Sequence, residues 1–300
     1  MKRMLSIIFV VLALPLLGFG QLAPSGSQSE NPKTDANNED GIGVAPARFE
    51  LPMLPGTERT LVVNIIYNSA SQTAQPCRLV VSLGDWSILE DGSIDFFKAG
   101  TRPNSAAPWM VYSPGEVTAL PGKVHPVRVT VSVPKDATPG DHLAALFVES
   151  RPENIKLNEN RKQVILRFRM AALFYIMVPD ITRKGSLENL KTDSDGKEIV
   201  ITPTIKNEGN SHIRPMYSLK VIDPKGEIVA ALPETESLPV LAGLSLSRPI
   251  VIEKAVAPGA YSVFYRVDFK DGGAVVEGRT DLVVSGQQAK KGVDKVGSTN

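Results

Sequence analysis

The sequence predicts an all-β fold class: two tandem immunoglobulin-like β-sandwiches that follow a signal peptide and a disordered linker. Segments in which apolar and polar residues alternate, bounded by Gly, Pro, Asn and Asp, recur along both halves of the chain. This pattern is typical of half-buried antiparallel strands. The 300 residues include 24 Gly and 23 Pro, a content that fits a turn-rich β protein. Two sandwiches of about 100 residues each account for most of this length.

The order of these segments is the same in both halves. An alternating strand that ends in Asn and small polar residues is followed by a second strand and then by a strand that begins at a Pro-Gly pair. In the first half the segments are 61–69, 127–133 and 138–148. In the second half they are 199–209, 247–252 and 257–267. The repeat predicts one sandwich at 41–179 and another at 181–284, with a boundary near Pro179-Asp180.

Residues 1–20 have the pattern of a secretory signal peptide. Lys2 and Arg3 precede an apolar run, and Gly18 and Gly20 have the spacing of a signal-peptidase site. The run is shorter than the roughly 20 apolar residues that a membrane helix needs, although an uncleaved anchor is the alternative. We expect cleavage near Gly20, no stable membrane span in the mature protein, and a location in the periplasm or, after secretion, at the cell surface.

Two segments contain too little apolar surface to fold. Residues 21–40 are rich in Ser, Asn, Asp and Glu, and residues 285–300 are polar with several Gly and Lys. A segment that buries almost nothing cannot offset the entropy lost on ordering. We therefore predict a disordered linker at 21–40 and a disordered tail at 285–300.

The net charge argues against a nucleic-acid-binding protein, and the cysteine content argues against a disulfide-bonded one. The formal net charge is +1, which gives no sign of a basic face for phosphates, so we expect no nucleic-acid partner. Cys77 is the single cysteine of the chain, which excludes an intramolecular disulfide. Cys77 alternates with Leu79, Val81 and Leu83, so we predict that all four face inward from one strand.

The sequence shows no pattern of catalytic residues. The histidines are His125, His142 and His212, and no pair of them has metal-ligand spacing. No Ser lies in a nucleophile elbow, and no Gly-rich phosphate loop follows a strand. We expect no enzymatic activity, no cofactor and no metal. Trp86 and Trp109 are predicted to be core aromatics rather than a ligand platform.

Several stretches form a pattern that occurs together in one known family: residues 43–51, 68–69, 109–120, 129–148 and 169–179. They resemble the PapD-like periplasmic pilus chaperones. The similarity is to the N-terminal immunoglobulin-like domain of that family and covers about 41–179. Its most specific part is Leu173-Phe-Tyr175 followed by Pro179.

This resemblance implies a function by strand addition. In the family, the last strand of this domain pairs with a pilin subunit that lacks one strand, and two basic residues bind the subunit's terminal carboxylate. Arg48 lies where the first basic residue belongs, whereas Ala172 stands where the second is expected. The strand register implies that Gln163, Ile165 and Arg167 point at the subunit. The opposite face is then core, at Val164, Leu166, Phe168, Met170, Ala172 and Phe174. The partner-binding residues so implied are Arg48, Ile165, Arg167 and Arg169.

Residues 181–284 resemble a fibronectin-type or adhesion-type module, with a tight turn at Asp223 to Gly226. Two functions follow. The first is an exported PapD-like chaperone or assembly factor that binds a β-rich, pilin-like envelope or surface subunit. The alternative is a non-catalytic structural or adhesive module of the cell envelope, whose partner would be cell-wall polymer.

Overall fold

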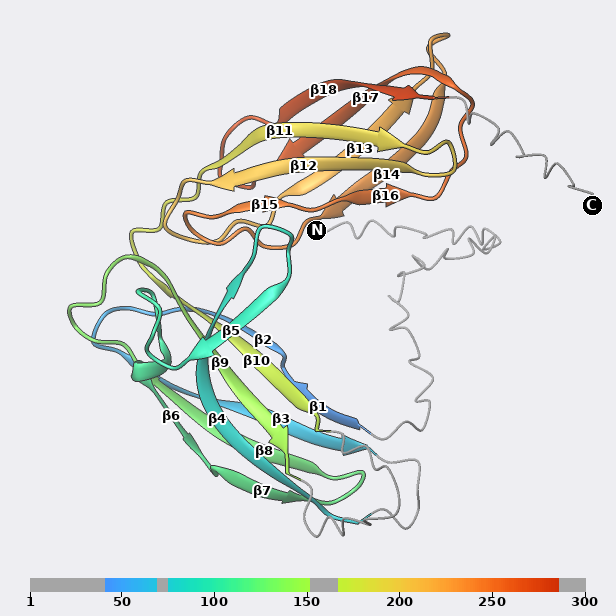
Figure 1. Cartoon of the computed structure of the whole chain (residues 1–300). Helices are drawn as coiled ribbons and strands as arrows, with labels where there is room; N and C mark the ends of the chain where they lie inside the picture. The colour runs from blue at the N-terminus through green and yellow to red at the C-terminus, as the bar shows by residue number, and fades with distance from the viewer. Residues whose placement is uncertain (1–40, 69–74, 152–166, 286–300) are drawn as a thin grey trace, which may run out of the picture. The chain divides into compact units, whose positions relative to one another are not determined.

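The computed structural model describes residues 41–68, 75–151 and 167–285, all of which belong to one compact unit (Figure 1). These residues form 18 strands and one helical element, the 3-10 turn η1 (Ala107–Trp109). The predicted all-β fold class is thereby confirmed. The predicted signal peptide at 1–20, linker at 21–40 and tail beyond residue 285 lie outside the described residues.

The first sandwich consists of two facing sheets. One has the order β1 (Gly41–Ala45), β3 (Glu58–Asn68), β8 (Val124–Ser132) and β6 (Met110–Ser113). The other has the order β2 (Arg48–Pro52), β10 (Arg169–Val178), β9 (Gly140–Ser150), β4 (Cys77–Ile88) and β5 (Ile94–Lys98), with β7 (Glu116–Ala119) beside β4. The chain crosses from the first sheet to the second between β1 and β2.

Alternation along the strands builds the core of this sandwich. In β8, Val127, Val129 and Val131 are fully buried, whereas Arg128 between them is exposed. Leu146 of β9 and other residues of the second sheet meet these valines in a single apolar cluster. β-branched side chains suit such positions because they pack well on a pleated, half-buried surface.

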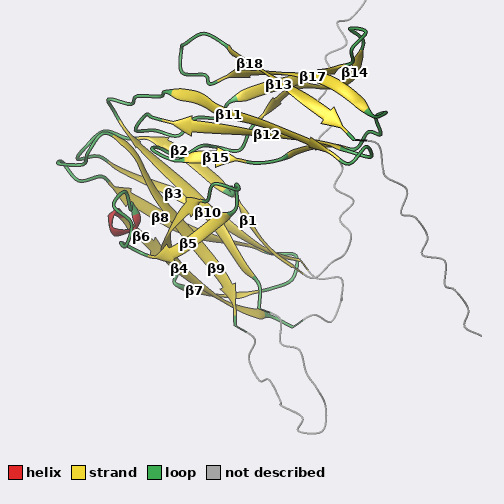
Figure 2. Cartoon of the chain, turned by 45° about the horizontal axis from the view of Figure 1, so that its top comes forward, coloured by secondary structure: helices red, strands yellow, loops and turns green. Residues whose placement is uncertain are grey.

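The second sandwich also has two sheets (Figure 2). One has the order β11 (Gly185–Ser194), β12 (Ile199–Asn207) and β15 (Ser245–Ser247), and β16 (Ile250–Ile252) pairs with another part of β12. The other has the order β14 (Ile228–Glu236), β13 (Met216–Ile222), β17 (Gly259–Asp268) and β18 (Val276–Val284). Ile199, Ile201, Val221 and Val263 are fully buried between them. The predicted turn at Asp223 is present, closed by the N–H of Gly226 donating to the Asp223 carbonyl over 3.0 Å.

Strand β10 is paired unevenly on its two sides. Antiparallel pairing with β9 extends from Arg169 to Val178. Parallel pairing with β2 covers only Leu173 to Met177. Within the described part of the chain, no strand pairs with residues 169–172 on the β2 side. We call this stretch the open edge of β10.

The open edge corrects one prediction. Ala172 and Phe174 are buried in the core as expected, but Phe168 and Met170 are 43% and 39% exposed. The reason is that β2 begins opposite Leu173, so the side chains before that point lie at the uncovered rim of the sandwich.

The predicted inward face of β4 is only partly buried. Leu79 and Val81 are buried, and Cys77 and Leu83 are half-buried against the same cluster. Burial raises the pKa of the Cys77 thiol, which favours its neutral form.

Candidate partner-binding site

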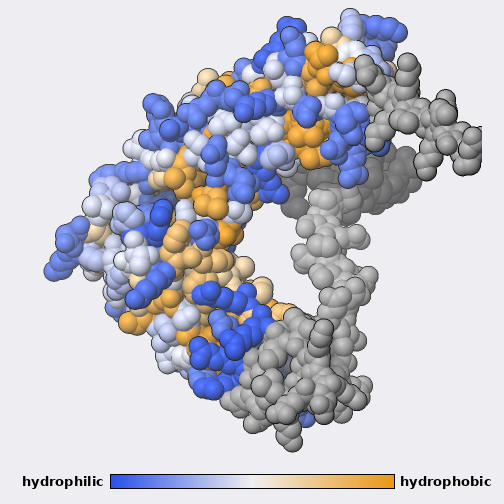
Figure 3. Space-filling model, in the orientation of Figure 1, coloured by the Kyte–Doolittle hydropathy of each residue, from blue (hydrophilic) through white to orange (hydrophobic). Residues whose placement is uncertain are grey.

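The site is built on the face of the β2-β10-β9-β4-β5 sheet that points away from the sandwich's own core, here called the outer face. Alternation places Arg169, Ala171, Leu173 and Tyr175 of β10 on this face. The surface view shows apolar residues gathered over the β5, β9 and β10 part of the molecule (Figure 3). A sheet that is apolar on both faces needs a covering element or a partner on the second one.

One end of the outer face carries an aromatic cluster. The guanidinium carbon of Arg169 lies 3.8 Å from the centre of the Phe147 ring. The ring of Phe96 meets Phe147 edge-on, with 5.0 Å between centroids. Gly84 makes this possible, because a Cβ at that position would collide with the Phe147 ring. Arg169 thus lies over the Phe147 ring, beside the open edge of β10.

Two of the four predicted site residues lie apart on the same face of this sheet. Arg48 begins β2 opposite Leu173, and its side chain is 54% exposed. Arg169 lies four residues back along β10 on the same face, about 13 Å away at the usual rise of a strand. Arg167 is exposed and precedes β10. Ile165 lies outside the described residues.

Position 172 faces the wrong way to supply a second basic residue. Ala172 is fully buried in the core of the first sandwich. A longer side chain at this position would therefore enter the core rather than reach Arg48. The second cation next to Arg48 comes instead from the other sandwich.

That cation is Arg214, in the loop between β12 and β13. Its Nε and Nη2 atoms donate to Oε1 of Glu50 on β2, over 3.2 and 3.0 Å. Its Nη2 atom also lies 3.5 Å from the hydroxyl of Tyr175. Sequence reasoning missed Arg214, and no local signal could have found it, because Glu50 is 164 positions away.

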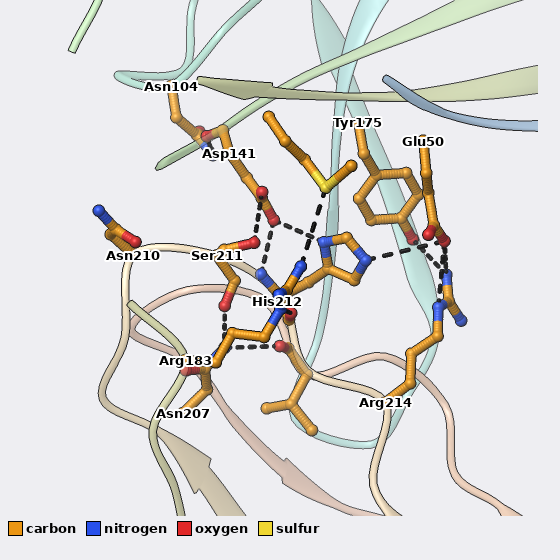
Figure 4. Close-up of polar contacts among 12 residues, drawn as sticks. Glu50, Asn104, Asp141, Tyr175, Arg183, Asn207, Asn210, Ser211, His212 and Arg214 are labelled. Carbon is orange, nitrogen blue, oxygen red and sulfur yellow. Dashed lines mark hydrogen bonds and ion pairs between the residues drawn. The ribbon is translucent and has the colours of Figure 1, made fainter. Parts of the chain in front are cut away.

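A buried polar network connects the two sandwiches next to this point (Figure 4). The carboxylate of Asp141 on β9 accepts hydrogen bonds from the Ser211 hydroxyl at 2.7 Å and from the His212 backbone N–H at 2.6 Å. Nδ1 of His212 lies 2.7 Å from the same carboxylate. All three residues are buried.

The loop that carries Ser211 and His212 is shaped by Asn207. The buried side-chain amide of Asn207 donates to the carbonyl oxygens of Ser211 and Val240, over 2.8 and 2.9 Å. Its side-chain oxygen accepts from the N–H of Gly209. A Cβ at Gly209 would collide with the Thr182 carbonyl. The Asn-Glu-Gly-Asn sequence thus fixes the loop that meets Asp141.

Trp86 and Tyr175 pack at the same junction. Their rings meet edge-on with 4.9 Å between centroids, and the ring of His212 lies 4.4 Å from that of Tyr175. Burial raises the pKa of Tyr175 to about 12. Trp86 is buried as predicted, but on the outer face, where it joins the apolar cluster of the second sandwich rather than the core of the first. Trp109 is half-buried and packs on His142.

The described residues hold neither a metal-binding cluster nor a membrane-spanning helix. They contain no group of three or more His, Cys, Asp or Glu placed to hold a metal ion. Among their elements there is also no helix long and apolar enough to cross a membrane.

Comparison with known proteins gave structural similarity alone. No family model and no curated protein matches the chain. A chain of a chaperone–tip adhesin complex of CFA/I fimbriae biogenesis is 10% identical, with 80% of this chain and 98% of that chain covered and a TM-score of 0.42. The Pseudomonas aeruginosa CupB2 chaperone is 12% identical, with coverage of 79% and 97% and a TM-score of 0.37. The E. coli chaperone DraB is 13% identical, with coverage of 80% and 98% and a TM-score of 0.37. Over most of its length the chain is similar to these chaperones.

Proposed function

We propose that this protein is an exported, non-catalytic assembly factor that holds a β-rich, pilin-like subunit by strand addition at the open edge of β10. The observation that carries the proposal is the stretch at 169–172, which no strand of the described residues pairs on the β2 side, next to the point where β2 begins. An edge with free backbone groups is a template for pairing with another chain.

The backbone groups that face outward at this edge can be identified. The N–H of Leu173 donates to the Ala47 carbonyl, and the carbonyl of Met177 accepts from the N–H of Met53, both toward the β2 side. The N–H and C=O of one strand residue point the same way, and the direction alternates along the strand. Arg169 and Ala171 therefore present their backbone groups to an incoming strand.

Side chains at the open edge favour an apolar partner. Phe168 and Met170 expose large apolar surfaces on one face, and Arg169 and Ala171 lie on the other. Full burial of one such side chain stabilises a complex by about 1.5–3 kcal/mol. Phe168 and Met170 thus offer the apolar contact that the family resemblance implied for Ile165, but on the opposite face of the strand.

Arg48 lies at the point where the partner strand would end. A strand that runs parallel to β10 beside residues 169–172 continues the line of β2 and ends where β2 begins, at Arg48. Its terminal carboxylate then meets the exposed guanidinium of Arg48. A charge-assisted hydrogen bond of this kind is short and strong.

The proposal is tested by titrating the protein with a short synthetic peptide of alternating Val and Thr that ends in a free carboxylate. Ala171→Pro removes an N–H that faces the open edge but none that bonds β9, so we expect it to abolish binding without unfolding the sandwich. Arg48→Ala should weaken binding by about 1–3 kcal/mol. Equal affinity in wild type and both variants would contradict strand addition. Retention on purified peptidoglycan without peptide binding would instead favour the structural or adhesive envelope module.

A further inference from the structure

A cavity opens into the second sandwich where the edge of one sheet is interrupted. β15 pairs with residues 204–206 of β12 and β16 with residues 199–201, and no strand of the described chain pairs with residues 202–203 on that side. Pro203, and Pro249 between β15 and β16, lack the backbone N–H that a continuous ladder needs. The cavity lies between the two sheets and has a volume of about 260 Å³, and its apolar wall includes Ile205, Leu238 and Leu246.

Two tyrosines line this cavity. Tyr265 of β17 is 1% exposed, and its ring centre lies 5.6 Å from that of Tyr217 of β13. Neither hydroxyl has a hydrogen-bond partner among the residues that the structure describes. Within this part of the chain, Nε1 of Trp86 is the buried side-chain atom that is both closed off from solvent and without a partner. The Tyr265 hydroxyl, which also lacks a partner, is therefore in contact with the open space of the cavity.

The same cavity is lined by a cation without a partner. Arg248 makes no hydrogen bond or ion pair with any described residue. Burial raises the pKa of both tyrosines, and the positive charge of Arg248 opposes the rise at Tyr217, so its guanidinium lies near the Tyr217 hydroxyl. Both phenols therefore keep their protons at neutral pH and can donate hydrogen bonds. Glu236, the acidic residue that lines the cavity, lies 3.8 Å from Arg214 instead.

A turn of the first sandwich packs against this wall of the cavity. The N–H of Ser247 donates to the carbonyl of Glu90, in the turn between β4 and β5, over 2.6 Å. Gly92 of the same turn has a φ of 88°, and a Cβ there would lie 2.8 Å from Leu238 and 3.4 Å from Cδ of Arg248. The turn therefore contacts the stem of Arg248, and a side chain restricted in this way loses less entropy when a ligand binds.

We propose that this cavity binds a small aryl carboxylate, whose ring lies between the sheets and whose carboxylate accepts hydrogen bonds from Tyr217, Tyr265 and Arg248. Facing sheets are about 10 Å apart, a spacing that favours a flat ring. A volume of about 260 Å³ lies below the usual range for drug-sized ligands, so the ligand is small. Three donors without acceptors, one of them charged, select an anion. This site is independent of the proposed strand addition, because no residue of the open edge of β10 lines the cavity.

The test is a titration of the full chain with 3-phenylpropionate, followed by NMR through the backbone amide signals of residues 245–248. Two further probes are matched to it: 3-phenylpropionamide has no charge, and propionate has no ring. Tyr265→Phe and Arg248→Gln each remove one proposed donor. Tyr261→Phe, on the same strand, controls for the loss of a hydroxyl, and Arg279→Gln, on β18, controls for the loss of a charge, because neither residue lines the cavity.

We expect 3-phenylpropionate to shift these signals saturably, with a Kd in about the millimolar range, and the other two probes to bind at least about tenfold more weakly. Tyr265→Phe and Arg248→Gln should each weaken binding about tenfold, the scale of one hydrogen bond to a charged group, and both control variants should bind as wild type does. Tyr265→Phe should unfold at no lower a urea concentration than wild type, because its hydroxyl has no protein partner to lose. Absence of saturable shifts, equal binding of 3-phenylpropionate and its amide, or unchanged affinity in Tyr265→Phe overturns the site.

Discussion

Asp141 of the first sandwich is hydrogen-bonded to the loop between β12 and β13 of the second. Its carboxylate takes up hydrogen bonds from Ser211 and His212, and all three residues are buried. Burial without a partner costs each polar group the water that it lost on folding. The arrangement is stable because the carboxylate satisfies these donors together.

Asp141→Ala should therefore lower the free energy of unfolding by about 3 kcal/mol or more, since it leaves buried donors without acceptors. Urea denaturation of the full chain measures the change. Asp136→Ala, at an exposed position nearby in sequence, should stay within about 0.5 kcal/mol of wild type. Equal effects of the two substitutions would show that the junction does not depend on this network.

The raised pKa of Tyr175 predicts how the free energy of unfolding changes at alkaline pH. Burial raises its pKa from 10.0 to about 12 in the folded protein. The folded state therefore holds the phenolic proton more tightly than the unfolded state, so stability is complete below pH 10 and falls as pH rises toward 12. The loss is about 2–3 kcal/mol by linkage. Tyr175→Phe should reduce this slope in denaturant titrations across that range, and an unchanged slope would contradict the assignment.

At the scale of the element, β10 combines two environments along one strand. Leu173 to Met177 are covered by β2, and the residues before them are not. Side chains that alternation assigns to the same face thus differ in burial. The local pattern of β10 could be predicted from sequence, whereas the length of its cover depends on where β2 begins.

A matched pair of substitutions on β10 tests this difference. Met170→Lys should change the free energy of unfolding by less than about 0.5 kcal/mol, because the side chain is exposed at the open edge. Ala172→Lys should cost more than about 3 kcal/mol, because it places an unpaired charge in the core. Thermal and urea unfolding of both variants give the comparison. Similar losses in the two would mean that Met170 is packed.

At the scale of the whole molecule, the sandwiches meet through backbone as well as side chains. The N–H of Asp141 donates to the carbonyl of Asn210 over 2.9 Å. Gly140 has a φ of 113°, and a Cβ there would collide with the same carbonyl. Only glycine permits this approach at such a backbone angle.

Gly140→Ala should therefore destabilise the protein by about 2–3 kcal/mol and increase its radius of gyration, since the Asn210 loop must move away. Gly226→Ala is the control: its φ is 88° but nothing lies near its added Cβ, so about 1 kcal/mol is expected. Urea unfolding and small-angle scattering measure the two effects. A radius of gyration unchanged in Gly140→Ala would argue against this contact.

The fold class, most strand positions and the turns can be predicted from the amino-acid sequence. These follow from local rules: alternation in a stretch such as Val127 to Val133 defines two faces, and Asp or Gly at fixed places permits tight turns. Arg48 was also placed at the site through the resemblance of its neighbours to a known family. Pro139-Gly140 was predicted as the start of a strand, but not as a contact with Asn210.

The elements that cover each face, and the charges that meet, depend on how the chain packs in three dimensions. Trp86 lies on the outer face against the second sandwich, Phe168 is exposed because β2 starts too late to cover it, and Arg214 meets Glu50 across 164 positions. Such contacts leave no periodic trace in the sequence. They arise because two separately patterned sandwiches bury surface against each other, and the residues that meet there are set by that packing rather than by their neighbours in the chain.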